Sequence, residues 1–177
     1  MNLLLNDSSV LLNLIAGDCL REIVIATGWQ VVVCSAVRDE VKKLRDPGTG
    51  DLVPIDIGPL ISAGLVQVLD LANQQEQTTY IEQSIFMDDG EAMSVAIAAN
   101  RGLDLAIDDK QATNHIHRTF PNLRLWSTPE ILQHWVKTAP VQTARLGQII
   151  HAIEVRARYF PSKAHPLAKW WQSFRGA

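Results

Sequence analysis

An acidic turn that opens into a helix of small apolar residues is the feature of this chain best suited to chemistry. Asp88, Asp89 and Glu91 surround Gly90 in this turn, and residues 92–99 are almost all small or apolar. We therefore expect a helix that is buried on most sides. Asp88 or Asp89 is expected to cap it, whereas Glu91 either complements the helix dipole or points inward. An inward carboxylate is costly to bury unless a positive charge meets it.

Further acidic residues stand at points where neighbouring elements end. Asp7 follows a short apolar run at residues 3–5, and Asp108 and Asp109 follow a second run at residues 103–107. Each of them alone is explained by helix capping. Glu40 lies at the border of the apolar face of a helix that we expect over residues 35–44, where a solvated position is the simpler interpretation. Asp39, its neighbour, is expected to point further outward.

Short apolar runs alternate with amphipathic segments over the first 139 residues, which predicts an α/β fold with a central, mostly parallel sheet of four to five strands and helices on both faces. In such sheets, ligand sites form beyond the carboxyl ends of the strands, so the acids after residues 3–5 and 103–107 should face one crevice. The expected strands are 3–5, 31–34, 65–71, 103–107 and 123–126, and the expected helices are 8–15, 19–26, 35–44, a short one from Pro59, 73–85, 90–100, 110–118 and 129–137.

Converging carboxylates raise one another's pKa values and destabilise a fold unless a cation neutralises them. Hard divalent cations such as Mg²⁺ and Mn²⁺ prefer oxygen ligands and activate water for hydrolysis of phosphodiesters. The sequence shows no P-loop, no cysteine nucleophile signature and no serine hydrolase signature. Metal-assisted phosphodiester hydrolysis is therefore the chemistry that best matches the residues.

Four segments carry a resemblance to a known family: residues 3–12, 38–41, 89–96 and 106–110. In this order and spacing they resemble the PIN-domain family of metal-dependent ribonucleases, and the third resembles the VapC-like toxins of toxin–antitoxin modules. The resemblance implies a three-layer PIN-like fold over residues 1–139. It also implies endoribonuclease activity on RNA with Mg²⁺ or Mn²⁺, a homodimer, and an antitoxin protein as partner.

The same resemblance assigns roles to individual residues. The catalytic, metal-binding acids would be Asp7, Glu40, Glu91 and Asp109, with Asp108 as the alternative at the fourth position. Glu91 stands where many relatives have aspartate, which changes its reach but not its ligand chemistry. Ser9 would be the hydroxyl beside the first acid, and with Lys110 it would contact the substrate.

Charge is distributed unevenly along the chain. Residues 1–139 carry 10 Lys and Arg against 18 Asp and Glu, a net charge of −8, whereas residues 140–177 carry 6 against 1, a net charge of +5. We expect this basic and aromatic tail to form a helical extension, with one long helix over 142–158 and a short one over 166–174. It either binds RNA through phosphate contacts and base stacking or packs its aromatic rings on the domain or across a dimer.

The remaining observations concern compartment and competing functions. Cys19 and Cys34 do not form a CxxC motif, which favours buried thiols in a reducing cytoplasm. Neither a signal peptide nor a membrane-spanning run is evident in the sequence. Two alternatives to the nuclease remain. One is a non-catalytic RNA- or protein-binding module on the same fold, and the other is a receiver- or phosphatase-like domain that forms an aspartyl phosphate.

Overall fold

A five-stranded parallel sheet lies at the centre of the computed structural model, which describes residues 2–5 and 7–175, the side chains of 2–5 excepted. Its strand order is β5-β2-β1-β6-β7, and every neighbouring pair is parallel. Asn6, within the first of the four motifs, lies outside the described residues. The sheet strands are β1 (Asn2–Leu5), β2 (Gln30–Cys34), β5 (Val66–Leu69), β6 (Asp104–Ala106) and β7 (Leu125–Trp126).

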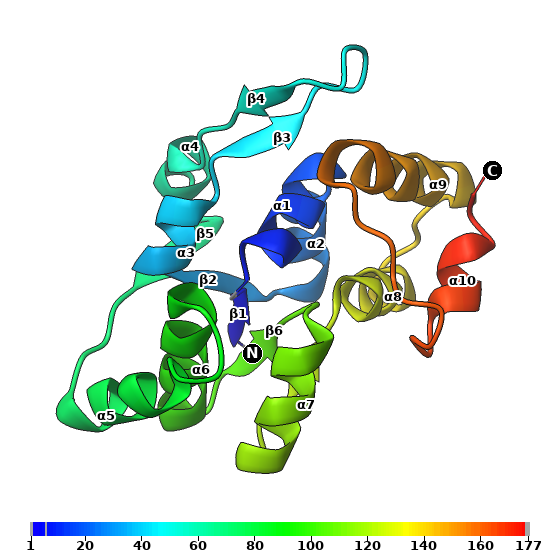
Figure 1. Cartoon of the computed structure of the whole chain (residues 1–177). Coiled ribbons are helices and arrows are strands. Elements are labelled where there is room, and N and C mark those ends of the chain that lie inside the picture. The colour runs from blue at the N-terminus through cyan, green and yellow to red at the C-terminus, as the bar shows by residue number, and fades with distance from the viewer. Residues whose placement is uncertain (1, 6, 176–177) are drawn as a thin grey trace.

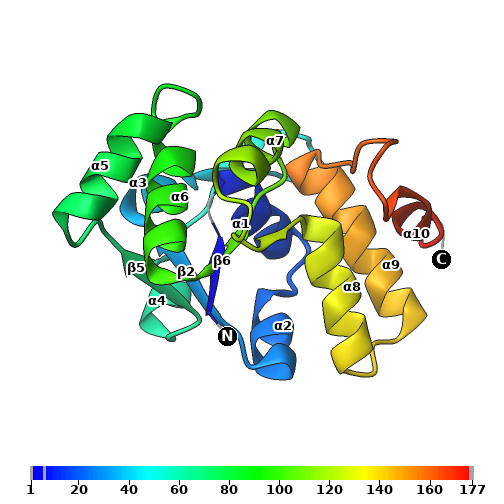
Figure 2. The same ribbon diagram turned by 90° about the horizontal axis from the view of Figure 1, so that it is seen from below.

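Helices flank this sheet on both sides. Figures 1 and 2 show α3, α5 and α6 on one side and α1, α2, α8 and α9 on the other. The mixed α/β class and the parallel sheet are therefore confirmed. The helices are α1 (Ser8–Ala16), α2 (Leu20–Thr27), α3 (Ser35–Glu40), α4 (Gly58–Ser62), α5 (Gln74–Gln83), α6 (Asp89–Arg101), α7 (Lys110–Thr119), α8 (Thr128–Thr138), α9 (Thr143–Ala152) and α10 (Ala168–Gln172), with a π-helical turn η1 (Ile153–Ala157) directly after α9.

The chain changes direction in the sheet between β1 and β6. From β1 it runs outward through β2 to β5, and it then crosses to β6 and β7 on the other side of β1. The carboxyl ends of β1 and β6 thus border the topological switch point, which is where open α/β sheets bind their ligands. Asp7 and Asp108 follow these two strands.

The predicted helix over residues 35–44 is wrong. It ends at Glu40, and the chain then forms an antiparallel hairpin of β3 (Lys43–Arg45) and β4 (Leu52–Pro54). The hairpin projects from the body at the top of Figure 1. Val41 and Leu44 supplied the apolar spacing that suggested a helix. Both are buried, but they lie outside the helix, and Leu44 belongs to β3. Cys34 caps α3, and its Sγ atom accepts a bond from the Val37 amide.

The tail packs on the body of the protein. Ile149, Ile153 and Trp171 are fully buried in the same core as the residues of the sheet. Arg145 forms an ion pair with Glu22, with 2.6 Å between Nη2 and Oε1. The expected single helix over 142–158 is α9 followed by the π-helical turn, and the short terminal helix is α10. Packing on the domain is therefore what the structure shows for much of this tail.

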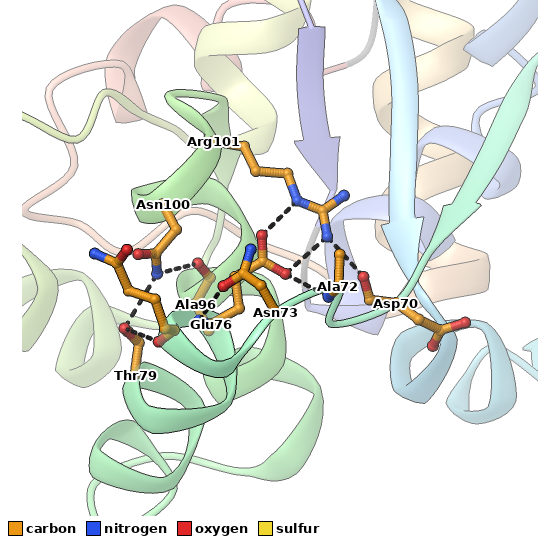
Figure 3. Close-up of polar contacts among 9 residues, drawn as sticks. Asp70, Ala72, Asn73, Glu76, Thr79, Ala96, Asn100 and Arg101 are labelled. Atoms are coloured by element: carbon orange, nitrogen blue, oxygen red, sulfur yellow. Dashed lines mark hydrogen bonds and ion pairs between the residues drawn. The ribbon is translucent and has the colours of Figure 1, made fainter.

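A buried ion pair fastens α5 to α6, as Figure 3 shows. Both oxygens of the Glu76 carboxylate accept bonds from the Arg101 guanidinium, at 2.7 and 2.8 Å. Arg101 also donates to the carbonyl of Asp70, and the Ala72 amide donates to Glu76. Because Glu76 is only 1% exposed, this pair holds the helix that carries Glu91 against its neighbour.

Candidate functional site

Asp7 lies at the switch point between β1 and β6. Its Oδ1 atom accepts hydrogen bonds from Ser9 Oγ and from the Val10 amide, both at 2.7 Å, so it caps α1. Its Oδ2 atom accepts a bond from the Asp108 amide at 3.2 Å. One carboxylate thus joins the ends of two neighbouring strands, and Ser9 stands beside it as the resemblance implies.

Asp108 is held by four donors. Thr128 donates through its amide and its hydroxyl, at 2.9 and 2.6 Å, Asn13 donates through its amide group at 3.1 Å, and Tyr159 donates through its hydroxyl at 2.8 Å. Burial, followed by the charge of Asp7, raises the Asp108 pKa to about 6. Because both of its oxygens are engaged by protein donors, this side chain fixes the end of β6 and is poorly placed to bind a metal ion.

Asp109 points in a different direction from Asp108. It caps α7 by accepting a bond from the Ala112 amide at 2.7 Å, and its charge raises the pKa values of Asp7 and Glu91. Lys110 follows it as the first residue of α7 and is exposed to solvent. Of the two neighbouring aspartates, Asp109 is thus the one whose charge acts on both Asp7 and Glu91.

In the acidic turn, one residue caps the helix and another points inward, as the sequence suggests. Asp88 caps α6 by accepting a bond from the Glu91 amide at 2.8 Å. Asp89 instead accepts a bond from the Tyr80 hydroxyl at 3.1 Å. Glu91, by contrast, is only 9% exposed. The carboxylate that was expected to turn inward does so.

Glu91 shares its surroundings with the other acids. Burial raises its pKa to about 7, and the charges of Asp88, Asp109 and Asp7 contribute in that order. A carboxyl group whose pKa is raised by burial and by like charges is characteristic of functional sites, where such environments concentrate. Any nearby cation would favour the ionised form.

Glu40 lies against the start of α6. If Gly90 carried a Cβ atom, that atom would lie 3.0 and 3.2 Å from the two carboxylate oxygens of Glu40. Burial and the charges of Asp88, Asp89 and Asp7 raise the Glu40 pKa. Asp39 forms an ion pair with Arg38 and has a side chain that is 64% exposed, as expected for the outward neighbour.

The residue types fit a hard divalent cation, although the side chains do not form a closed ligand set. Asp7, Glu40, Glu91 and Asp109 offer oxygen ligands of the kind that Mg²⁺ and Mn²⁺ prefer. Within the part of the chain that the structure describes, no three His, Cys, Asp or Glu side chains lie close enough together to hold a metal ion. The acids thus raise one another's pKa values without forming a metal site. To bind Mg²⁺ or Mn²⁺, their side chains would have to move closer together.

Gly90→Ala is expected to separate the geometry of this site from the stability of the fold. The added methyl group would displace the Glu40 carboxylate and press on Val37 Cγ2, which lies 3.2 Å from the Cβ position. Alanine favours the helix by about 1 kcal/mol relative to glycine, and the close contact with Val37 opposes this gain, so the two effects on the unfolding free energy should largely offset each other. Activity that depends on Glu40 should fall about tenfold. Denaturant unfolding and an activity assay on the same preparation measure both effects; undisturbed activity would contradict this placement of Glu40.

Other residues around this site were not expected from the sequence. Asn13, Thr128 and Tyr159 hold Asp108, and no local pattern indicates this role. Ser127 and Glu130 form a capping box at the start of α8, for which the spacing Ser-x-x-Glu is a readable signal. His165 in the tail contacts this capping box, with 3.0 Å between its Nε2 atom and Ser127 Oγ.

The chain matches no protein-family model, no curated protein and no solved structure. The resemblance to PIN-domain ribonucleases therefore rests on the four sequence motifs. The described helices include none that is both long and apolar enough to cross a membrane.

Proposed function

We propose that this protein is a metal-dependent endoribonuclease with a three-layer PIN-like fold. The observation that carries the proposal is the electrostatic coupling of acids around the switch point of a parallel sheet: the charge of Asp7 raises the pKa values of Glu40 and Glu91, and the charge of Asp109 raises those of Asp7 and Glu91. Asp7, Glu40 and Glu91 each have a pKa raised by burial and by acidic neighbours. Such a concentration of charge weakens a fold, which argues that it is kept for a ligand that compensates it.

The proposed mechanism assigns distinct work to these side chains. Asp7, Glu40, Glu91 and Asp109 would hold Mg²⁺ or Mn²⁺, which supplies an activated water for attack on the phosphodiester. Ser9 and the Val10 amide orient the Asp7 carboxylate through its Oδ1 atom. Asp108 keeps its backbone amide directed at Asp7 Oδ2 and so positions the first acid without binding the ion itself.

The biological setting belongs to the same proposal. By its resemblance to VapC-like proteins, the chain would be the toxin of a toxin–antitoxin module, with an antitoxin protein as partner and a homodimer as its assembly. Cys19 and Cys34 are free and buried, which fits a reducing compartment such as the cytoplasm.

A second candidate is a non-catalytic module that binds RNA or a protein on the same fold. The observation in its favour is that no three metal-ligating side chains lie together in the described part of the chain. The two candidates differ in turnover, because only the nuclease cleaves RNA when Mg²⁺ or Mn²⁺ is added.

Glu40→Gln is expected to lower RNA cleavage at least about tenfold. An amide binds Mg²⁺ less well than a carboxylate, and the substitution also removes one negative charge from the cluster. The matched control is Asp39→Asn, which changes the neighbouring, exposed acid. Cleavage of a labelled single-stranded RNA is followed with Mg²⁺, with Mn²⁺ and with a chelator. Equal losses in both variants would contradict the proposed site, and tight RNA binding by the wild-type protein without cleavage in either metal would establish the non-catalytic module.

A further inference from the structure

A cavity of about 500 Å³ lies beside the acidic site, between α7, the start of α8 and the tail segment 159–166. Asp108 forms part of its wall, and the Asp108 amide is bonded to Asp7. The cavity therefore adjoins the proposed catalytic carboxylates through one shared residue. Its volume lies within the range of pockets that hold small organic ligands. In Figure 1 the tail that closes it runs past α8 after leaving α9.

The wall formed by α7 is polar and basic. Lys110, Thr113 and His117 all line the cavity, and their spacing of three and four residues places them on one face of the helix. Lys110 begins α7, where the helix dipole adds to its positive charge. This wall can bind an anion such as a phosphate.

The opposite wall is aromatic. Tyr159 is fixed there by its bond to Asp108, while Phe160 is 53% exposed and has no core position. The Arg175 guanidinium lies 5.2 Å from the centroid of the Phe160 ring and supports it. An exposed phenylalanine at the mouth of a cavity is the kind of surface on which nucleobases stack.

Ser127, His165 and Glu130 also line the cavity, but they are not arranged as a nucleophile with its base. The Leu167 amide donates to His165 Nδ1 at 3.0 Å, so the proton of the neutral ring lies on Nε2 and points to Ser127 Oγ. The Ser127 hydroxyl in turn donates to Glu130 at 2.8 Å. His165 thus cannot take the serine proton, and burial lowers its pKa, which keeps the ring neutral. These groups anchor the tail, and the cavity is a binding site without its own reaction.

We propose that this cavity binds one nucleotide of single-stranded RNA next to the phosphate that is cleaved, with the base stacked on Phe160 and a phosphate beside Lys110. This inference rests on the proposed function and deepens it, because it assigns the cavity between α7 and the tail, with Phe160 and Lys110, as the place where a nucleotide beside the cleaved bond binds. An unpaired base can turn into such a cavity without the cost of breaking a base pair. The tail therefore contributes to the substrate site through Phe160, while its other aromatic residues pack against the protein.

Binding of uridine and adenosine 5′-monophosphates in the presence of a chelator tests the cavity without any cleavage. Phe160→Ala is expected to weaken binding of both nucleotides about tenfold, the effect of losing one stacking ring. Phe160→Leu keeps the apolar volume and should lose nearly as much. The matched control, Phe86→Ala, removes another exposed phenylalanine, 64% exposed and outside the cavity, and should leave binding unchanged. Lys110→Ala should abolish the preference for the monophosphate over the free nucleoside.

The outcomes separate this inference from the proposed function. Absence of binding by the wild-type protein at millimolar nucleotide, or equal binding by the Phe160 and Phe86 variants, would overturn the inference. If the nucleotides bind as expected but RNA is not cleaved in any metal, the cavity stands and the nuclease proposal fails. If RNA is cleaved and Phe160→Ala leaves KM unchanged, the nuclease stands and the cavity does not bind substrate.

Discussion

Asp7→Asn is expected to reduce RNA cleavage by at least about a hundredfold while the protein stays folded. Metal ions contribute several kcal/mol to stabilising the transition state of phosphodiester hydrolysis, and each 1.4 kcal/mol corresponds to a factor of ten in rate. Asp7 is the acid most central to the cluster, because its charge raises the pKa values of Glu40, Glu91 and Asp108. Removing that charge therefore weakens the attraction of the acidic cluster for a cation.

The same substitution should change the stability of the fold little, because losing the bond from the Asp108 amide, which the asparagine NH2 group cannot accept, is offset by removing a buried charge. Asparagine caps helices about as well as aspartate, so the bond from the Val10 amide can persist. Burial raises the pKa of Asp7, which means that the folded protein pays to keep this group ionised at neutral pH. An inactive variant with undiminished stability is the mark of a residue retained for function.

Two measurements check this prediction on one protein preparation. Denaturant unfolding gives the stability, and a thermal shift with added Mn²⁺ reports binding of the ion without RNA. The wild-type protein should gain stability with Mn²⁺ and Asp7→Asn should gain little. A variant that cleaves RNA normally would remove Asp7 from the mechanism, and a variant that unfolds would show that Asp7 serves the fold.

Capping residues and strand alternation made much of the fold predictable from the sequence. Asp88 caps α6, as the sequence indicates, and Gly102 ends the helix in a left-handed conformation. The parallel pairing of β1 with β6 follows from the alternation of strands and helices, and it brings Asp7 beside Asp108. Helix caps depend on a few neighbouring residues, and parallel pairing depends on the order of strands and helices, so both can be predicted from the sequence.

Features decided by distant contacts were not predictable in the same way. Residues 41–45 have helical apolar spacing, yet Leu44 pairs with Val53 of a strand that only the folded hairpin brings near. Tertiary pairing overrides local helix propensity in such cases. Asp108 was a candidate ligand because it adjoins Asp109, and its donors Asn13, Thr128 and Tyr159 stand 95, 20 and 51 residues away. No local sequence pattern indicates that these three residues donate hydrogen bonds to Asp108.

Arg101→Met is expected to lower the unfolding free energy by about 3–5 kcal/mol at neutral pH, the usual cost of removing one partner from a buried ion pair. Glu76, 1% exposed, would keep its charge without the guanidinium that binds both of its oxygens. A domain of this size has a total stability of only about 5–15 kcal/mol. Loss of this contact therefore removes a large share of it and weakens the packing of α5 on α6, which the bond from Asn100 to Thr79 still joins (Figure 3).

Lowering the pH should remove stabilisation from the wild-type protein but relieve part of the destabilisation in Arg101→Met. In the wild-type protein the hydrogen bonds from Arg101 lower the Glu76 pKa below its ordinary value of 4.5. The stabilisation from this group is therefore complete above about pH 4.5, the pKa in the unfolded chain, and is lost as the pH falls through the lower, folded pKa. In Arg101→Met the largest cause of the lowered Glu76 pKa is gone, so the carboxylate takes up its proton at a higher pH than in the wild-type protein and the stability difference between the proteins shrinks as the pH falls.

Denaturant unfolding at a series of pH values between neutrality and about pH 4 measures this convergence. Arg38→Met is the matched control, because it removes an arginine whose ion pair with Asp39 is exposed to solvent, and it should leave the unfolding transition in place. A stability difference that stays constant with pH would mean that Arg101 acts through the packing of its side chain and not through the charge of Glu76. Convergence towards acid pH, seen for Arg101→Met and absent for Arg38→Met, would assign the effect to the buried carboxylate, since only a group that titrates can make the cost of the substitution depend on pH.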